Sequence, residues 1–403
     1  MRPSFPVRLG AAEESLIAQL KAAGADQAAE RVTVAGLPTR RVESYHYTDL
    51  KTLLRAIPPL AQAANEATAT ALRVPGAYAL SIVNGAVQTA ATAPEGIKLG
   101  KTHGGVLTNR DDVIVSVSNA LTKDVLSLDL VGAIEQVVQI DHRIEGAAGH
   151  VTDATKIFVA DDSSVVILET FSGSDAAHVG NHATYLALGK NAVVTHVTLD
   201  LSGRATSHFA TNEYHLADGA QLRTLIIHAG AGLSRTHLFP RMAGEGAHAD
   251  VTGLNLVSEG QHSDITMETL HAVPHTSSQP LFKSITRGRS KAVVQGKLIV
   301  ARDAQKTDAK FMHQGLMLSD DAEILSKPEL EIYADDVVCG HGSTCGKLDE
   351  DSLFYLLSRG IPKAEAETML VRGFIAELID PIEDEALNEA LQGVVDGWLL
   401  GGQ

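Results

Sequence analysis

The chain opens with a hydrophobic pattern that is typical of an amphipathic helix. Within residues 12–31, apolar side chains recur at helical spacing and charged side chains lie opposite them. These apolar positions are Leu16, Ile17, Leu20 and Ala23. Gly24 follows on the same face, where it either ends this helix or interrupts it.

A shorter helix is predicted after the turn GLPTRR. Thr48 is placed to cap it, and Pro58-Pro59 stops it. Its apolar side is formed by Leu50, Leu53 and Leu54.

Over residues 76–345 the pattern changes to short apolar runs separated by polar turns. The runs are rich in β-branched residues, as strands are. No long amphipathic helix pattern intervenes, which argues against a sheet built from alternating strands and helices. The clearest runs cover residues 112–117, 156–160, 164–171, 192–201, 222–229, 292–300 and 330–338.

The turns between these runs also recur. Five of them place a Gly, Asp or Ser turn just before an alanine and a strand, and steps of 28, 27, 45 and 30 residues separate the alanines. The marker positions are Ala192, Ala220, Ala247, Ala292 and Ala322. A period of this size is typical of a solenoid whose coils bury their apolar faces on one another, with one coil unmarked or irregular at the long step. The pattern leaves a β-sandwich of unrelated hairpins open as the alternative.

Residues 348–403 return to a helical pattern. One helix ends at Gly360, a second starts with Pro362 in its first turn, and a third covers residues 381–400. The predicted apolar positions are Ala366, Met369, Leu370, Phe374 and Leu378 in the second helix and Leu387, Leu391, Val394, Val395 and Trp398 in the third. These helices could cap the open edge of the solenoid or present a face to a partner.

Together these patterns predict a mainly β protein with three parts. Residues 1–75 form an N-terminal helical domain, residues 76–347 form a parallel β-helix core, and residues 348–403 form a C-terminal helical domain.

Composition supports this architecture and narrows the function. Hydrophobic residues make up 44% of the chain and aromatic residues only 4%, so aliphatic side chains must fill the core, as suits stacked strands. The formal net charge of −16 would repel a phosphate backbone, so no nucleic acid is expected as a partner. Two cysteines are too few for a disulfide-stapled secreted domain, and neither a signal peptide nor a membrane-spanning run is evident. We therefore expect a cytoplasmic protein.

The sharpest local motif is CGHGSTC at residues 339–345. On a strand, Cys339 and His341 would point the same way, and a thiolate with an imidazole suits zinc, copper or an iron–sulfur cluster. The glycines on either side of His341 let another backbone or a cluster approach closely. Two or three ligands cannot close a tetrahedral site, so a full site needs a donor from elsewhere or from a second chain. The alternative is a buried cysteine and a hydrogen-bonded histidine beside a turn.

Two other features carry less weight. Seventeen histidines are scattered through the chain, and most are expected to be solvated or structural. The stretch GIKLGKT at residues 96–102 has one residue too few between its glycines for a phosphate-binding loop. Any ATP hydrolysis is therefore expected to come from a partner protein.

Several long segments resemble the SufB/SufD family of SUF-system scaffold proteins. The resemblance is strongest between residues 262 and 375, where ordered segments match one after another. These segments are HTSSQPLFKSI at 275–285, GRSKAVVQGKLIVARDAQKTDA at 288–309, LMLSDDAEILSKPELEIYADDVVCGHGSTCG at 316–346 and FYLLSRGI at 354–361. Near the N-terminus, GLPTRRVESYHYTDL at 36–50 is similar to the SufD branch of the family.

The resemblance implies a right-handed parallel β-helix that pairs with SufB and docks the ATPase SufC through its C-terminal helices. It implies that His341, with Cys339 as an accessory, helps to build a transient iron–sulfur cluster at the SufB interface. It implies neither enzymatic activity nor a cofactor held stably by this chain alone, and it assigns no role to Cys345. The implied SufC-binding residues are Phe354, Leu357, Arg359, Met369, Phe374 and Leu378.

Three other functions stay open at this point. The chain could be SufB-like and carry the cluster itself, or it could be a homodimeric interaction module without a metal. A β-helical enzyme acting on polysaccharides is the third, and the low aromatic content and missing secretion signal argue against it. The sequence leaves open whether the isolated chain homodimerises.

Overall fold

The computed structural model describes residues 8–62, 70–88 and 92–401 and contains two large sheets and seven α-helices within them. The strands of the nine-stranded sheet are β3 (Ile97–His103), β4 (Asp124–Leu130), β6 (His150–Val159), β8 (Val179–Leu188), β10 (Ser207–Leu216), β12 (Leu233–Met242), β14 (His262–His271), β17 (Lys291–Val300) and β19 (Glu323–Ile332). The strands of the eleven-stranded sheet are β1 (Tyr78–Val83), β2 (Ala86–Val87), β5 (Val138–Ile144), β7 (Ser164–Gly173), β9 (Val193–Asp200), β11 (Gln221–His228), β13 (His248–Val257), β15 (Ser277–Ser278), β16 (Leu281–Thr286), β18 (Asp308–Met317) and β20 (Val338–Gly346). The helices are α1 (Ala11–Ala22), α2 (Asp26–Ala35), α3 (Leu50–Leu53), α4 (Val113–Leu121), α5 (Glu350–Ser358), α6 (Lys363–Ile379) and α7 (Glu385–Leu400), with a short 3-10 turn at Glu43–Tyr45.

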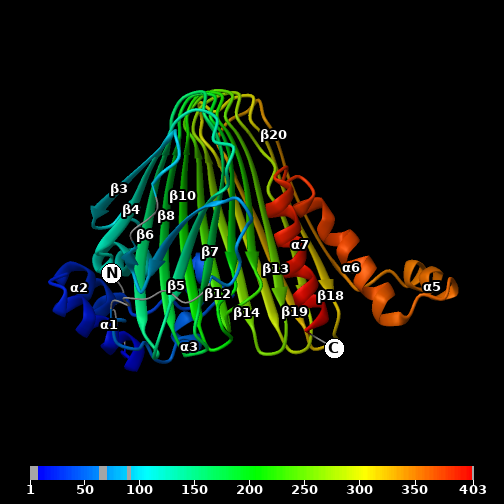
Figure 1. Ribbon diagram of the computed structural model, residues 1–403, viewed down its shortest axis with the longest axis horizontal. Helices are drawn as coiled ribbons and strands as arrows, with labels where there is room; N and C mark the ends of the chain where they lie inside the picture. The colour runs from blue at the N-terminus through cyan, green and yellow to red at the C-terminus, as the bar shows by residue number, and fades with distance from the viewer. Residues whose placement is uncertain (1–7, 63–69, 89–91, 402–403) are drawn as a thin grey trace.

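The two sheets face each other and form a parallel β-solenoid (Figure 1). From β5 onward the chain passes between the sheets and pairs each strand with the preceding coil in parallel register. Paired residues in neighbouring coils lie 26 residues apart at Ser207 and Leu233 and 32 apart at Lys291 and Glu323. The aliphatic core lies between the sheets, so each coil buries its inner face on the next. The predicted mainly β solenoid is confirmed.

The marker alanines are buried, and the long step between two of them passes from one sheet to the other. Ala192, Ala220 and Ala247 precede strands of the eleven-stranded sheet, whereas Ala292 lies on β17 of the other sheet. The step of 45 residues therefore changes sheets. The coil that it passes is unmarked and irregular, as predicted, because Thr276 takes the place of the alanine and the strand is divided into β15 and β16.

One predicted strand is a helix. Residues 112–117 are rich in β-branched residues, yet α4 begins there because the Asp112 carboxylate accepts hydrogen bonds from the backbone N–H groups of Ile114 and Val115. Val113 and Ile114 are buried in a cluster with the N-terminal helices. Packing and the cap outweigh the strand propensity of this run.

The N-terminal helices cover the outer face of the nine-stranded sheet. Gly24 has a φ of +73° and ends α1, so the predicted segment forms two helices. Thr48 does not cap α3, because Asp49 accepts the hydrogen bond from the backbone N–H of Thr52. The buried Thr48 hydroxyl instead donates to Asp264 on β14 and fixes this segment to the sheet.

The C-terminal helices cover the outer face of the eleven-stranded sheet. Helices α6 and α7 bury Val371, Ile375, Leu391 and Val395 in one cluster with β-strand residues of that face. Figure 1 shows α7 along the sheet and α5 projecting away from the solenoid. Of the two roles left open for these helices, α6 and α7 therefore do not fill that of a cap on the open edge. In the described part of the chain, no helix combines the length and hydrophobicity that a bilayer crossing requires.

Candidate functional site

The last coil of the solenoid ends in two strands that each have a free side. Within the described residues, β19 pairs only with β17, and β20 pairs only with β18. The opposite end is closed by the antiparallel pairs β1–β2 and β3–β4. The molecule therefore has one open end, and it carries the CGHGSTC motif.

Cys339 and His341 lie on the inward face of β20. They stand in register with Ala309 and Phe311 of β18, and both of these residues belong to the core. Because residues in register on parallel strands point to the same side, Cys339 and His341 continue the inner face of the solenoid. No later described coil covers them, so His341 is exposed and Cys339 is half-buried.

Cys345 lies on the same face, because it follows His341 by four residues along the same strand. It stands in register with Gly315, and a methyl group at Gly315 would lie 3.3 Å from the Cys345 sulfur. Three sulfur and nitrogen donors thus follow one strand, at spacings of two and four residues. With a rise of about 3.3 Å per residue, they are too widely spread to surround one ion by themselves. The open rung offers a partial set of ligands.

The two thiols are held in their protonated form. Burial raises the pKa of Cys339, and the nearby Asp308 carboxylate raises it further, while a hydrogen bond with the Ala309 backbone opposes both. Burial also raises the pKa of Cys345. A metal or cluster must displace these protons when it binds, because only the thiolate is a good ligand.

The glycines beside His341 differ in their surroundings. A Cβ at Gly340 would meet no atom within 4 Å, whereas one at Gly342 would lie 2.7 Å from the Met312 methyl carbon. The space that another chain could enter is therefore on the Gly340 side.

Helix α5 follows β20 after only three residues and has no buried side chain. Phe354 is 71% exposed, and Leu357, Arg359 and Met369 are exposed as well. Exposed apolar side chains gathered on a projecting helix are a feature of surfaces that bind another protein.

Two of the residues expected to bind the partner ATPase serve to hold α6 in place. Leu378 is buried against the eleven-stranded sheet. Phe374 is partly buried, and its carbonyl oxygen accepts a 2.7 Å hydrogen bond from Lys283, whose ammonium group also lies over the Phe374 ring. The predicted apolar stripe of α6 is confirmed at Ala366 and Leu378, which are buried, and is wrong at Met369, which is exposed. Val371 and Ile375 are buried as well.

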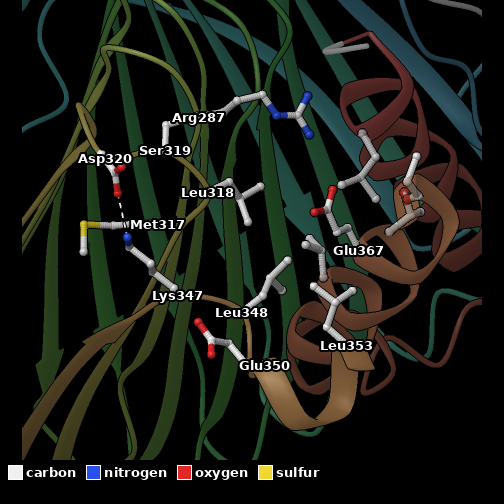
Figure 2. Close-up of a pocket in the computed structure, with 14 residues that line it drawn as sticks. Arg287, Met317, Leu318, Ser319, Asp320, Lys347, Leu348, Glu350, Leu353 and Glu367 are labelled. Atoms are coloured by element: carbon white, nitrogen blue, oxygen red, sulfur yellow. Dashed lines mark hydrogen bonds and ion pairs between the residues drawn. The ribbon is translucent and has the colours of Figure 1, made fainter. Parts of the chain in front are cut away.

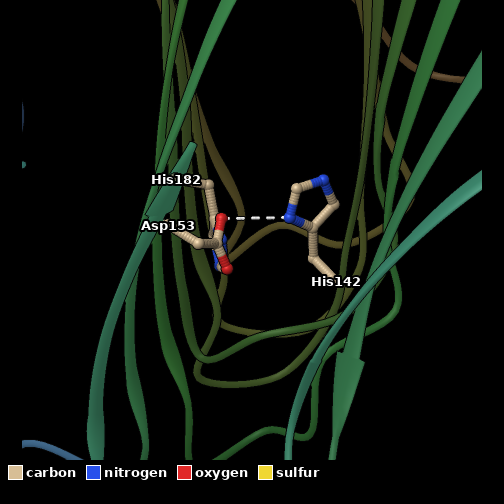
Figure 3. A group of neighbouring side chains, drawn as sticks. All are labelled: His142, Asp153 and His182. Atoms are coloured by element: carbon tan, nitrogen blue, oxygen red, sulfur yellow. Dashed lines mark hydrogen bonds and ion pairs between the residues drawn. The ribbon is translucent and has the colours of Figure 1, made fainter. Parts of the chain in front are cut away.

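The interior contains a further group of metal-ligating side chains that motif analysis missed. His142 on β5, Asp153 on β6 and His182 on β8 come together between the two sheets (Figure 3). Asp153 and His182 stand in register, one coil apart. The coil period applied to the sequence would have paired these two residues, but no spacing rule brings His142 to them from the other sheet.

Comparison with known proteins agrees with this architecture. Residues 142–374 match the family model described as "SUF system FeS cluster assembly, SufBD core domain". The chain is 27% identical to the iron–sulfur cluster assembly protein SufD of Escherichia coli K12, over 94% of this chain and 93% of that protein. It is 28% identical to a SufBD family protein of Mycobacterium bovis, over 89% of each chain, and 30% identical to one of Synechocystis, over 59% of this chain and 55% of that protein. Since the family model covers more than half of the chain, the protein belongs to the SufBD family of iron–sulfur cluster assembly proteins.

Proposed function

We propose that this chain is a non-enzymatic scaffold subunit that pairs with SufB through its open end and binds the ATPase SufC through its C-terminal helices. A nascent iron–sulfur cluster forms at the SufB interface, with His341 as a ligand and Cys339 beside it. The cluster is transient and is not held by this chain alone.

The observation that carries the proposal is the incomplete ligand set on the uncovered rung. Cys339 and His341 face inward in a position where the next coil of a solenoid would lie. A second β-helical chain placed end to end would cover this face and supply the missing donors. Free backbone groups along β19 and β20 favour such pairing between strands.

The connection between β20 and α5 suggests how a conformational change in SufC, driven by ATP hydrolysis, is transmitted to this interface. Residues 347–349 connect the ligand strand to the exposed helix, so a pull on α5 acts directly on β20. A cavity of about 480 Å³ lies between this connection, the turn at Asp320 and the C-terminal helices (Figure 2). The connection is held across it by the Lys347–Asp320 ion pair at 2.6 Å, which is exposed to solvent and therefore weak. SufC would bias the interface between closed and open states.

The test is a His341→Ala variant in cells that depend on the SUF system. We expect cluster assembly to be lost, because the rung then keeps no imidazole ligand, while the complex with SufB and SufC still co-purifies. His103→Ala is the matched control, since His103 is an exposed histidine at the closed end of the solenoid. Normal cluster assembly with His341→Ala would refute the assigned site.

The shared face of Cys339, His341 and Cys345 also supports a second candidate, a SufB-like chain that carries a cluster itself. Anaerobic reconstitution of the isolated chain with iron and sulfide separates the two functions. A stable brown chromophore that survives gel filtration would favour the cluster carrier, and a colourless protein would favour the shared site.

A further inference from the structure

We propose that the solenoid interior contains a binding site for one divalent transition-metal ion, Zn²⁺ or Fe²⁺, formed by His142, Asp153 and His182. This site is separate from the open rung and would be filled as the coils close around it during folding.

The three side chains converge from both sheets in a fully buried position. One donor atom from each lies within 4.8 Å of the others, and each residue is at most 3% exposed. Asp153 Oδ1 lies 3.0 Å from His142 Nδ1 and 2.8 Å from His182 Nδ1. These contacts are close to the separations between ligand atoms around a tetrahedral ion with bonds of about 2.0–2.2 Å. Small outward movements of the three groups would admit the ion.

The donor set suits a borderline metal. Two imidazoles and one carboxylate are typical ligands of zinc and of non-haem iron, whereas calcium and magnesium prefer oxygen alone.

The second observation is a set of unpartnered polar atoms beside the site. His142 Nε2 and Glu169 Oε1 are buried without a hydrogen-bond partner, and His142 Nε2 lies 3.9 Å from Glu169 Oε2. With a metal on Nδ1, His142 carries its proton on Nε2, directed toward the Glu169 carboxylate. A carboxylate is the usual outer partner of a metal-bound histidine. The ion would also offset the charge of two carboxylates in a dry interior.

The surroundings hold both rings in position. Phe171 packs against His142 and His182 with ring centroids 4.7 Å apart in each case. Gly180 leaves the space that the second ring needs, because a Cβ at this position would lie 2.6 Å from His182 Nε2. Because the two imidazoles are already held in place, metal binding loses less side-chain entropy than it would with flexible ligands.

The competing state is a metal-free cluster in which a protonated His142 lies between Asp153 and Glu169. It uses the same hydrogen bonds to Asp153, and the two carboxylates favour it by raising the pKa of His142 against the effect of burial. The two states differ in metal content, which can be measured directly.

The experiment uses the full chain with Cys339, His341 and Cys345 all changed to alanine, so that no metal binds at the open rung. The protein is refolded from urea with Co²⁺ or Zn²⁺, treated with EDTA, passed through gel filtration and analysed for metal by mass spectrometry. We expect about one ion per chain, retained because the site is buried. Asp153→Asn and His182→Gln should reduce retention at least tenfold, and His313→Gln, a buried histidine outside the group, should not change it.

A folded chain that retains no metal would establish the metal-free cluster and overturn the proposal, as would retention that Asp153→Asn and His182→Gln leave unchanged. If these variants do not fold, the Co²⁺ form of the triple-alanine chain decides. X-ray absorption should show nitrogen and oxygen neighbours with imidazole scattering, and a shell without imidazole would contradict the site. Because the rung donors are absent, this result does not depend on the proposed cluster function.

Discussion

At the residue scale, the solenoid interior depends on small residues placed opposite large ones. Gly296 on β17 faces the Phe311 ring of β18, and a Cβ at this position would overlap ring atoms. Phe311 in turn packs against Phe282 of the preceding coil, with ring centroids 5.6 Å apart. The absent side chain at Gly296 is therefore what admits the two aromatic rings near the last coils.

The Gly296→Ala substitution tests this packing. We expect it to lower the free energy of unfolding by about 1–3 kcal/mol, because the Phe311 ring must leave its position in a close-packed core. The measurement is the urea midpoint followed by circular dichroism. Gly340→Ala on β20 is the matched control, because the added methyl meets no atom within 4 Å. A shift as large as that of Gly296→Ala would contradict the explanation.

Some residues of the candidate site could be predicted from the sequence alone. Cys339 and His341 were found from alternation on a single strand, since both ligands and their spacing lie within one short motif. The same alternation puts Cys345 on this face, and the register with β18 shows that β20 extends far enough to include it. Ten of the seventeen histidines are buried, which fits the expectation that most of them are solvated or structural. The buried ones are His142, His150, His178, His182, His196, His208, His228, His237, His271 and His313.

At the element scale, strands were predictable where local pattern and tertiary environment agree. The runs at 164–171 and 192–201 match β7 and β9 closely, because both faces of a solenoid strand are buried and β-branched residues suit them. The run at 112–117 failed, because a helix capped by Asp112 buries the same apolar residues against other helices. Local composition cannot choose between these outcomes, which depend on partners far away in the sequence.

Helix α5 gives the prediction at this scale. Phe354→Asp should leave folding unchanged, because the side chain has no buried contact, and should weaken SufC binding at least about tenfold if this ring is an anchor of the interface. The dissociation constant is measured by calorimetry with purified SufC. Val34→Asp provides the control, since Val34 is 69% exposed on α2 at the other end of the molecule. Equal affinity of Phe354→Asp and the unchanged chain would remove α5 from the docking surface.

At the scale of the whole molecule, the periodic turns predicted the solenoid. The sequence pattern did not predict which faces of the solenoid the helices cover. Helices α6 and α7 have apolar stripes that fit a sheet edge or a sheet face equally well. Their position is decided by the apolar outer face of strands such as β9 and β11. The strand residues that form the other half of the cluster are Val197, Leu199, Leu225 and Ile227. Within the described residues, α6 and α7 pack on a sheet face and leave the last coil uncovered, so the end of the solenoid that carries the site stays free.

The buried histidines make the stability of the whole solenoid depend on pH. Burial lowers the pKa of His271 and of His313 from 6.5 to about 4. Both rings are therefore neutral, and they form hydrogen bonds with the hydroxyl groups of Thr276 and Ser284 respectively. In the unfolded chain these histidines bind protons below pH 6.5, whereas in the folded chain they do so only near pH 4. Their contribution is therefore fully present above pH 6.5 and is lost progressively as the pH falls from 6.5 to 4. A shift of this size corresponds to about 3 kcal/mol for each histidine.

We expect the urea midpoint to fall steeply as the pH is lowered over this interval. The His271→Asn variant keeps a polar group near Thr276 but removes one titrating side chain. Its midpoint should therefore depend less steeply on pH, by the contribution of about one proton. A midpoint that stays constant between pH 6.5 and 4 would show that these side chains can be protonated without opening the coils, and the dry, hydrogen-bonded interior described here would then be wrong.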